Sequence, residues 1–503
     1  MNAAHLDPDE FRRQGHAVVD WIADYYRRVE EFPVRSAVHP GDIASALPLD
    51  PPAGGEGIEA LLADLDRIVL PGLTHWQHPS FFAYFPANTS GPAILGDLLS
   101  SGLGVQGMIW ATSPAATEVE TRVMDWLAEL LDLPQRFRSG GAGGGVINDT
   151  ASTAVLTVLV AALHRASRGR ARVDGLRGQY TVYCSTEAHS SVAKAVAIAG
   201  VGSQQLRLIP TVSPGGPMDV AALAAAMAAD HSAGLVPAMV VSAVGTTGTG
   251  AVDPTAEIAA VAARHGAWVH VDAAWAGVAA VAPEHRRLTN AGLELADSYA
   301  TNPHKWLLTT FDCDALYVAD SAALIGAMSQ TPEYLRTQQS DAGTVIDYRD
   351  WHIQLGRRFR PLKLWAVLRH YGSAGLAAHI RAGVSLVDRL VAGLQGDARF
   401  TVTHRQLSLV CLHLATGAGL DADNTATLAL MHAINDSGAA YLSHTSVDGR
   451  TLLRVAVGTP STEERHIDAL LDAMRAAADN VIPETATAPA AAAHTATGEP
   501  AGR

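Results

Sequence analysis

The segment Asn302-Pro303-His304-Lys305-Trp306 places a lysine between a histidine and a tryptophan, and two leucines follow it. An apolar neighbourhood removes water from an ammonium group, which lowers its pKa and makes the neutral amine available to attack a carbonyl carbon. We therefore expect Lys305 to form a Schiff base with a carbonyl compound. The alternative is a surface lysine whose aliphatic stem lies along Trp306 while its ammonium group stays in water.

Asp272 closes the apolar run Trp268-Val269-His270-Val271-Asp272, and Ala273 and Ala274 follow. This pattern predicts a buried strand with a carboxylate at its carboxyl end, beside residues small enough to admit a flat ligand. Such a carboxylate can pair with a protonated ring nitrogen. His270 and Asp272 point to the same side of a strand, so they could instead be metal ligands. No further cluster of His, Cys or Glu residues supports that alternative, and we expect no metal.

A histidine and a threonine follow two other β-rich runs. His189 comes shortly after the run that ends at Cys184, where an imidazole could stack on an aromatic ring. A structural histidine is the alternative. Thr246 lies in Gly245-Thr246-Thr247-Gly248, which follows the run 239–244 and offers a second contact for a ligand at the strand ends.

A glycine-rich stretch, 140–145, leads to Thr150 and Ser152 at the start of an apolar helix. Free backbone N–H groups at a helix start favour phosphate. The stretch is neither a Walker P-loop nor a GxGxxG motif, so nucleotide binding is not favoured. Taken alone, it is also compatible with a merely flexible loop. Together, the lysine, the acid, the histidine and this cradle are the groups that pyridoxal 5'-phosphate (PLP) requires.

Predicted strands and helices, which must position these groups, alternate from about residue 140 to 320. Short β-rich runs at 180–184, 239–243 and 268–272 are separated by Ala-rich helical segments such as 219–229 and 254–265. Alternation of strand and helix predicts an α/β fold with a mostly parallel sheet that is covered on both faces. Ligands of such sheets bind beyond the carboxyl ends of the strands.

The length of 503 residues predicts several units. We expect an N-terminal helical segment at 1–86, a large PLP-binding α/β domain at 87–377, a smaller α+β domain at 378–481 and a disordered tail at 482–503. The first helix carries an apolar stripe that must pack on the body of the protein or on a second subunit.

Composition narrows the classes of partner. The formal net charge of -14 argues against nucleic acid or an anionic membrane as the main partner. Three scattered cysteines support neither a disulfide framework nor a zinc site and fit a reducing cytoplasm. No signal peptide and no apolar run of membrane-spanning length occurs, so we expect a soluble cytoplasmic protein.

Several motifs resemble those of the aromatic-L-amino-acid decarboxylases, the group II PLP-dependent decarboxylases with the aspartate-aminotransferase-like fold (fold type I). The resemblance runs from about residue 7 to 475, roughly nine-tenths of the chain. Besides the segments around Lys305, Asp272 and His189, it rests on Phe81-Phe82-Ala83-Tyr84-Phe85-Pro86, Trp110-Ala111-Thr112-Ser113-Pro114-Ala115 and Leu355-Gly356-Arg357-Arg358-Phe359-Arg360.

The resemblance implies a role for each cofactor residue. Lys305 would form the internal aldimine, Asp272 would pair with the pyridine nitrogen and His189 would stack on the ring. The remaining contacts would come from Ala274 on the other side of the ring, from Thr246 near Lys305, from Ala151, Ser152 and Asn302 at the phosphate, and from His304.

The resemblance also implies a substrate pocket and a homodimer. The pocket would be lined by Trp76, Tyr84, Phe85, Pro86, Met108 and Gly356; ordinary core packing is the alternative for the aromatic stretch. Tyr334 resembles the tyrosine of a mobile loop, here about 328–345, that helps to protonate Cα and reaches the neighbouring subunit. We therefore expect sites at the subunit interface. Glycine at position 356 favours an indolic substrate such as tryptophan, and DOPA is the alternative substrate.

The expected reaction is decarboxylation of an aromatic L-amino acid to its arylalkylamine. The nearest alternative is an aromatic aldehyde synthase on the same scaffold, in which the loop tyrosine or the stacking histidine tends to be replaced; here Tyr334 and His189 are both present. A catalytically silent scaffold protein and a metal hydrolase are weaker alternatives. Two departures from the family pattern matter: Asp149 must point away from the phosphate, and Ala87 replaces a frequent hydroxyl residue.

Overall fold

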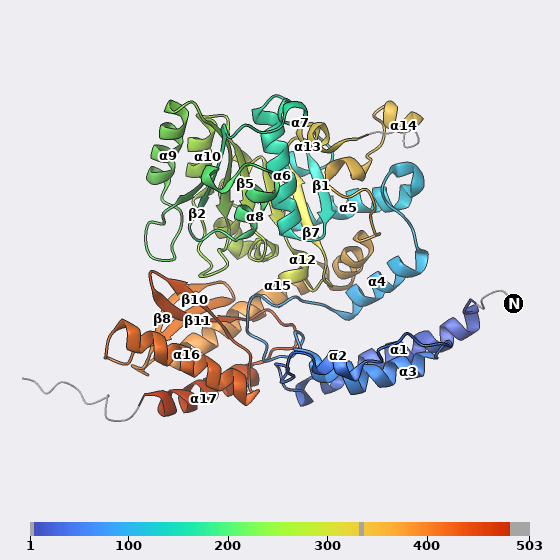
Figure 1. Cartoon of the computed structure of the whole chain (residues 1–503), viewed down its shortest axis with the longest axis vertical. Coiled ribbons are helices and arrows are strands. Elements are labelled where there is room, and N and C mark those ends of the chain that lie inside the picture. Colours follow the sequence, from blue (N-terminus) through green and yellow to red (C-terminus); the bar gives the residue numbers. More distant parts are fainter. Residues whose placement is uncertain (1–4, 331–336, 483–503) are drawn as a thin grey trace, which may run out of the picture.

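A computed structural model describes residues 5–330 and 337–482 of the chain (Figure 1). Tyr334 and nearly all of the predicted C-terminal tail lie outside the described residues. Two sheets organise the rest, a large one in the upper part of Figure 1 and a smaller one below it. Within the described part of the chain, no helix is both long and apolar enough to cross a membrane.

The large sheet has seven strands in the order β1-β7-β6-β5-β4-β2-β3. β6, β5, β4, β2 and β3 run parallel, and β7 is antiparallel to both of its neighbours. The prediction of a mostly parallel sheet is therefore confirmed. The strands are β1 (Gly144–Asn148), β2 (Tyr180–Ser185), β3 (Leu206–Ile209), β4 (Val236–Ala243), β5 (Trp268–Asp272), β6 (Ser298–Thr301) and β7 (Asp314–Val318).

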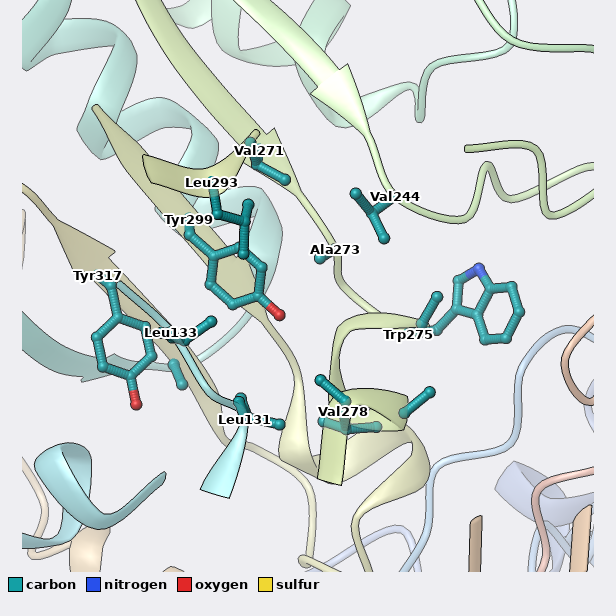
Figure 2. Packing of buried hydrophobic residues seen from close by; sticks show 14 of the residues in the cluster. Leu131, Leu133, Val244, Val271, Ala273, Trp275, Val278, Leu293, Tyr299 and Tyr317 are labelled. Carbon is teal, nitrogen blue, oxygen red and sulfur yellow. The ribbon is translucent and has the colours of Figure 1, made fainter. Parts of the chain in front are cut away.

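Helices cover both faces of the large sheet. Val271, Tyr299 and Tyr317 point into one buried cluster (Figure 2) with residues of α5 (Pro114–Leu130), α9 (Val220–Ser232) and α10 (Thr255–Ala263). The alternate residues of the same strands face a second cluster, which is covered by α6 (Ala151–Ala166), α8 (Ser191–Ile198) and α13 (Ser321–Met328). Both faces are thus buried, so ligands can reach the sheet at its edges.

The C-terminal part forms its own sheet and core. Its antiparallel strands follow the order β10-β11-β9-β8, and a separate apolar cluster lies between this sheet and its helices. The predicted boundary at 377/378 falls inside α15, whose helical conformation breaks at Gly372. The elements are α15 (Pro361–Leu394), β8 (Phe400–Gln406), β9 (Leu409–Leu414), α16 (Leu420–Ser437), β10 (Ser443–Val447), β11 (Arg450–Ala456) and α17 (Glu464–Val481).

The N-terminal helices lie along one side of the molecule (Figure 1). The first helix, α1 (Pro8–Arg28), begins at the capping carboxylate of Asp7 and has no buried residue, although it is strongly amphipathic. The other helices here are α2 (Asp42–Ala46), α3 (Ile58–Asp64) and α4 (Gly91–Leu103). Short helices elsewhere are α7 (Ala171–Asp174), α11 (Arg286–Thr289), α12 (Pro303–Trp306) and α14 (Gln338–Asp341).

The glycine-rich stretch 140–145 divides into two parts. A Cβ atom on Gly143 would lie 2.0 Å from the carbonyl oxygen of Arg136, and one on Gly145 would lie 2.6 Å from side-chain atoms of Met124 and Tyr317. A Cβ atom on Gly141 would meet nothing within 4 Å. The last glycines are therefore required by close packing in and beside β1.

This packing gives a stability prediction. Gly143→Ala forces a methyl group against backbone carbonyl oxygens, and overpacking of this kind costs about 1–3 kcal/mol or more. Gly141→Ala is the matched control and should leave the free energy of unfolding within about 0.5 kcal/mol of the parent. Denaturant unfolding of the three proteins measures both values. Equal stabilities would show that β1 tolerates a side chain at position 143.

Candidate active site

The carboxylate of Asp272 lies at the carboxyl end of β5, as the sequence predicts. The side chain is buried, and its Oδ1 accepts the backbone N–H of Ala274 at 3.1 Å. The carbonyl oxygen of Asp272 accepts the N–H of Val244, and the N–H of Ala273 donates to Ala300 of β6. The neighbouring strands therefore fix both the backbone and the direction of this carboxylate.

Lys305 lies on α12, one turn beyond the end of the neighbouring strand β6. Burial lowers the pKa of its amine, and the electrostatic effects of Asp272 and Asp314 oppose that shift. Among the described residues, no carboxylate oxygen forms an ion pair with Nζ within 4.0 Å. The amine is thus desolvated and near two acids without being neutralised by a direct ion pair, which is the environment that favours a nucleophilic lysine.

His189 lies beyond the end of β2 and belongs to the same electrostatic group. Burial lowers the pKa of its imidazole, and Asp272 and Lys305 both act on it. Its Nδ1 accepts the backbone N–H of Ser191 at 3.1 Å. The neutral ring therefore carries its proton on Nε2. The structure thus brings Lys305, Asp272 and His189 together at one edge of the sheet.

The predicted phosphate cradle is the start of α6. Thr150 is the N-cap residue, but its side chain makes no capping hydrogen bond. The first backbone N–H groups bonded within the helix are those of Thr153 and Ala154, which donate to the Thr150 carbonyl. Within the described residues, the N–H groups of Ala151 and Ser152 remain free, so a phosphate could accept both of them at the positive end of the helix dipole.

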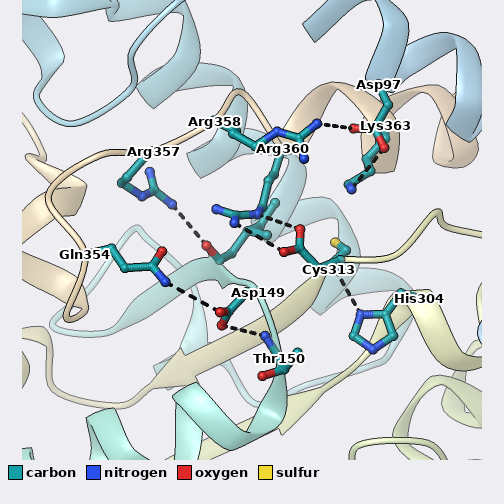
Figure 3. Close-up of polar contacts among 12 residues, drawn as sticks. Asp97, Asp149, Thr150, His304, Cys313, Gln354, Arg357, Arg358, Arg360 and Lys363 are labelled. Atoms are coloured by element: carbon teal, nitrogen blue, oxygen red, sulfur yellow. Dashed lines mark hydrogen bonds and ion pairs between the residues drawn. The ribbon is translucent and has the colours of Figure 1, made fainter. Parts of the chain in front are cut away.

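Asp149 precedes this cradle, and its carboxylate turns to other partners. One oxygen accepts the N–H of Thr150 at 2.7 Å, and the other lies 3.5 Å from the side-chain amide of Gln354 (Figure 3). The carboxylate is therefore held by the backbone of Thr150 and by the side chain of Gln354.

His304 determines how the neighbouring amide of Asn302 must be oriented. The backbone N–H of Cys313 donates to Nδ1 of His304 at 2.9 Å (Figure 3), and burial lowers the pKa of this ring to about 3. The ring is therefore neutral, with its proton on Nε2. Nδ2 of Asn302 lies 3.3 Å from that Nε2, so two donors would face each other.

Exchanging the amide oxygen and nitrogen of Asn302 removes this conflict without changing the shape of the side chain. Oδ1 then accepts from His304. As drawn, Oδ1 is buried without a partner; after the exchange, the amino group occupies that position. Asn302 therefore has an N–H donor available for an anionic ligand, as the phosphate of PLP requires.

Thr246 and Ala274 border the same region but offer little hydrogen bonding. The hydroxyl of Thr249 donates to Gly215, so the hydroxyl of Thr246 must donate to Thr249. Thr246 Oγ1 also accepts the N–H of Ala251. The polar capacity of Thr246 is therefore used within its own turn, and this residue, like Ala274, can contribute only shape to a ligand site.

The predicted substrate residues fall into three places. Phe85 is buried, stacks on Trp275 at 4.7 Å between ring centroids and meets the edge of Trp306 at 5.7 Å. Trp306 directly follows Lys305, but Phe85, Trp275 and Trp306 are all buried in one apolar cluster, so the structure shows core packing at Phe85. Pro86 is buried beside it, against Gly458.

Trp76 and Tyr84 stack on each other at 5.7 Å and are 39% and 51% exposed. Tyr84 adopts a positive φ of 53° and contacts Tyr441. Met108 and Gly356 lie elsewhere: the Met108 carbonyl accepts the N–H of Arg349, and Gly356 is exposed. Among the described residues, no hydrogen bond or ring contact joins Met108 or Gly356 to the lysine site.

Two charged residues near Lys305 were not predicted. Asp314 is the first residue of β7 and is completely buried. Arg454 of β11 is also buried, and burial lowers its pKa to about 10; it donates to the carbonyl oxygens of Thr247 and Tyr84. Each interrupts an apolar strand run in the sequence, and this interruption was the available signal.

No group of three or more His, Cys, Asp or Glu side chains is arranged to hold a metal ion in the part of the chain that the structure describes. His270, the alternative ligand, is completely buried in β5, and its Nδ1 lies 2.9 Å from the hydroxyl of Ser298.

A mostly parallel sheet with a lysine, an acid and a phosphate cradle at one edge, followed by a small antiparallel sheet, is the architecture of a fold type I PLP enzyme. Residues 40–415 match the family described as the pyridoxal-dependent decarboxylase conserved domain. The chain belongs to this family of PLP-dependent carboxy-lyases.

Individual relatives align with nearly the whole length of this chain. The chain is 44% identical to a phenylacetaldehyde synthase of Arabidopsis thaliana, over 92% of this chain and 94% of the relative. It is 43% identical to tryptophan decarboxylase 2 of Oryza sativa subsp. japonica, over 95% and 96% of the two chains. Among solved structures, the Oryza sativa TDC with PLP and tryptamine matches with a TM-score of 0.92 and 42% identity, over 95% of this chain and 99% of that one.

The electrostatic link between Asp272 and Lys305 can be tested in the cofactor-free protein. Removal of the nearby anion in Asp272→Asn destabilises the ammonium form, so the pKa of Lys305 should fall further. The neutral amine would then appear at lower pH. The pH dependence of reductive methylation of Lys305, followed by peptide mass spectrometry, measures this shift. Asp436→Asn, on the exposed end of α16, is the control, and an unchanged profile in Asp272→Asn would refute the link.

Proposed function

We propose that this protein decarboxylates an aromatic L-amino acid to the corresponding arylalkylamine and CO₂. The observation that carries the proposal is the desolvated amine of Lys305 beside Asp272 and His189, at the edge where β5 and β6 end. Family membership supports the cofactor and the class of reaction. The stacked and partly exposed rings of Trp76 and Tyr84 support the class of substrate.

PLP, when bound, supplies the electron sink that makes loss of the substrate carboxylate possible. Lys305 would hold the cofactor aldehyde through its amine, Asp272 would favour a protonated ring nitrogen, and His189 would lie against the ring. Ala151, Ser152 and Asn302 would hold the phosphate through N–H groups. Tyr334 would assist the return of a proton to Cα of the substrate.

The choice of substrate rests on the aromatic residues. Phe85, Trp76 and Tyr84 present flat apolar surfaces, which suit an aromatic side chain. By the family resemblance, glycine at position 356 favours an indolic substrate, and we propose tryptophan or a DOPA-like amino acid as the preferred substrate.

Aldehyde formation is the second candidate function, because two of the similar curated relatives are phenylacetaldehyde synthases. That reaction consumes O₂ and releases aldehyde and ammonia instead of amine. Retention of His189 and Tyr334 in the sequence favours simple decarboxylation.

We also propose that the protein is a homodimer with its sites at the subunit interface. Helix α4 exposes four leucines, Leu95, Leu98, Leu99 and Leu103, each at least 50% exposed. Helix α1 exposes Phe11 and Val19 and buries no residue. Exposed apolar side chains on both helices favour burial against a second subunit. Met108 and Gly356, which lie apart from the lysine site in one chain, would then be available to the partner's site.

We also propose the division into domains that the sequence predicts. The separate apolar clusters of the two sheets favour a large domain at 87–377 and a small domain at 378–481. A cytoplasmic location is proposed because Cys184, Cys313 and Cys411 are all free and buried thiols.

The reaction has a direct test. Lys305→Ala should lose at least about 10⁴-fold in turnover and should not retain the cofactor after borohydride reduction, because the covalent link is gone. Amine, aldehyde and peroxide are measured from tryptophan, DOPA, tyrosine and phenylalanine. Amine without peroxide supports decarboxylation, whereas stoichiometric aldehyde and peroxide would assign the synthase reaction. Retained turnover in the variant would overturn the site.

The dimer has a separate test. Replacement of Leu98 and Leu99 by Glu places two charges on the exposed face of α4, and each buried leucine contributes about 1.5–3 kcal/mol to association. Sedimentation equilibrium should show a dimeric parent and a dissociation constant raised at least about 100-fold in the variant. Val173→Glu, at an isolated position that is 84% exposed, is the control. An unchanged dimer in the double variant would place the interface elsewhere.

A further inference from the structure

The outer edge of β1 is covered by two charged side chains instead of by another strand. β1 is an edge strand of the large sheet, and among the described residues only β7 pairs with it. On its open side, the backbone N–H of Ile147 donates to Oε1 of Glu120 at 2.8 Å, and its carbonyl oxygen accepts Nη2 of Arg357 at 3.1 Å. A further antiparallel strand would bond these same two groups. Glu120 and Arg357 thus replace a neighbouring strand at Ile147.

Glu120 and Arg357 also form a bidentate ion pair with each other. Nη1 of Arg357 lies 2.9 Å from Oε2 of Glu120, and Nη2 lies 2.6 Å from Oε1. The side chains of Glu120 and Arg357 are 2% and 3% exposed. The guanidinium also lies over the ring of Tyr348, 4.9 Å from its centroid. A bidentate pair of this kind fixes the orientation of both groups, so the atoms that bond Ile147 have little freedom.

The pair joins segments that are distant in the sequence. Glu120 lies on α5, whereas Arg357 lies in the segment that leads to α15. The backbone N–H of Arg357 donates to the side-chain oxygen of Gln106 at 2.7 Å, and its carbonyl oxygen accepts the N–H of Gly107 at 3.0 Å. Arg357 is therefore held at its backbone as well as at its side chain, and it offers Ile147 a fixed donor.

Ile147 lies just before the predicted phosphate cradle. Only two residues separate it from Thr150, the N-cap residue of α6. One of these is Asp149, whose carboxylate contacts Gln354 of the segment that carries Arg357 (Figure 3). A connection this short transmits any shift of Ile147 to the start of α6, where the free N–H groups lie.

Stability alone gives little reason for a buried ion pair at this place. Removal of two charges from water costs about as much free energy as the pair regains, and an apolar pair of similar volume is often equally stable. Glu120 and Arg357 supply what an apolar pair cannot supply, which is an acceptor and a donor at fixed positions beside Ile147.

We infer that Glu120 and Arg357 are positioning residues for the cofactor phosphate. They fix Ile147, and thereby the course of the chain to Thr150 and the direction of the free N–H groups at the start of α6. A phosphate that accepts these N–H groups requires them at a narrow range of distances and angles. The inference rests on the proposed function, because it assigns the phosphate to the start of α6. Neither residue is assigned a contact with the cofactor.

An uncharged double variant tests this role without leaving a buried charge unpaired. Glu120→Leu with Arg357→Met removes the ion pair and both bonds to Ile147. Arg207→Met with Asp230→Leu is the matched control, because this bidentate pair lies on β3 and α9, at the opposite edge of the sheet. The dissociation constants of PLP and of pyridoxal, which lacks the phosphate, are measured on the full-length chain from the absorbance of the bound cofactor.

For PLP, we expect the Glu120/Arg357 double variant to bind about 10- to 100-fold more weakly than the parent, because the phosphate donors lose their fixed geometry. For pyridoxal it should stay within about threefold, as should the control variant for both ligands. The inference is overturned if the double variant binds PLP as well as the parent does, if it loses pyridoxal equally, or if the control loses PLP to the same extent. A parent that binds no PLP would instead refute the proposed function.

A second measurement depends neither on PLP nor on the folding of the double variant. Arg357→Lys keeps the positive charge but lacks the planar fork that spans Glu120 and Ile147. In the cofactor-free protein, amide hydrogen exchange followed by mass spectrometry should be faster in this variant than in the parent for peptides within 144–156, and unchanged for peptides of β3 and β4. Unchanged exchange within 144–156, or equal acceleration throughout the sheet, would contradict a positioning role.

Discussion

Partial desolvation at the carboxyl edge of the large sheet sets the direction of the pKa shifts of Lys305, His189 and Asp314. Burial is the first cause of the lowered pKa of Lys305 and His189 and of the raised pKa of Asp314. The same physical effect therefore favours the neutral amine of Lys305, the neutral imidazole of His189 and the protonated carboxyl group of Asp314.

Sheet topology explains why these groups meet. The parallel strands β5 and β6 end at the same edge, which brings Asp272 beside the segment that carries Lys305. Strand β7 runs in the opposite direction, so its first residue, Asp314, lies at the edge where the others end. The end of β1 and the start of α6 complete the same edge. One reversed strand thus adds a buried acid to a site otherwise built from strand ends.

The sequence predicts the local part of this arrangement and not the part that depends on register. Asp272 could be found because it closes an apolar run, Lys305 because a tryptophan and two leucines follow it, and the helix start at Thr150 has its own pattern. Asn148 and Asp314 come together only through pairing between β1 and β7. The glycines next to β1 looked like part of a ligand loop because their close contacts, with Arg136 and Tyr317, are also non-local.

The buried aromatic cluster of Phe85, Trp275 and Trp306 is built on the same chain segments as the candidate site. Trp275 follows the segment that carries Asp272, Trp306 follows Lys305, and the two indoles lie 6.1 Å apart. Phe85 contacts both rings, and its own chain continues to Asn88, whose N–H donates to the His304 carbonyl. The same segments of backbone therefore carry this buried aromatic cluster, the acid and the amine, so packing within the cluster helps to fix where the acid and the amine lie.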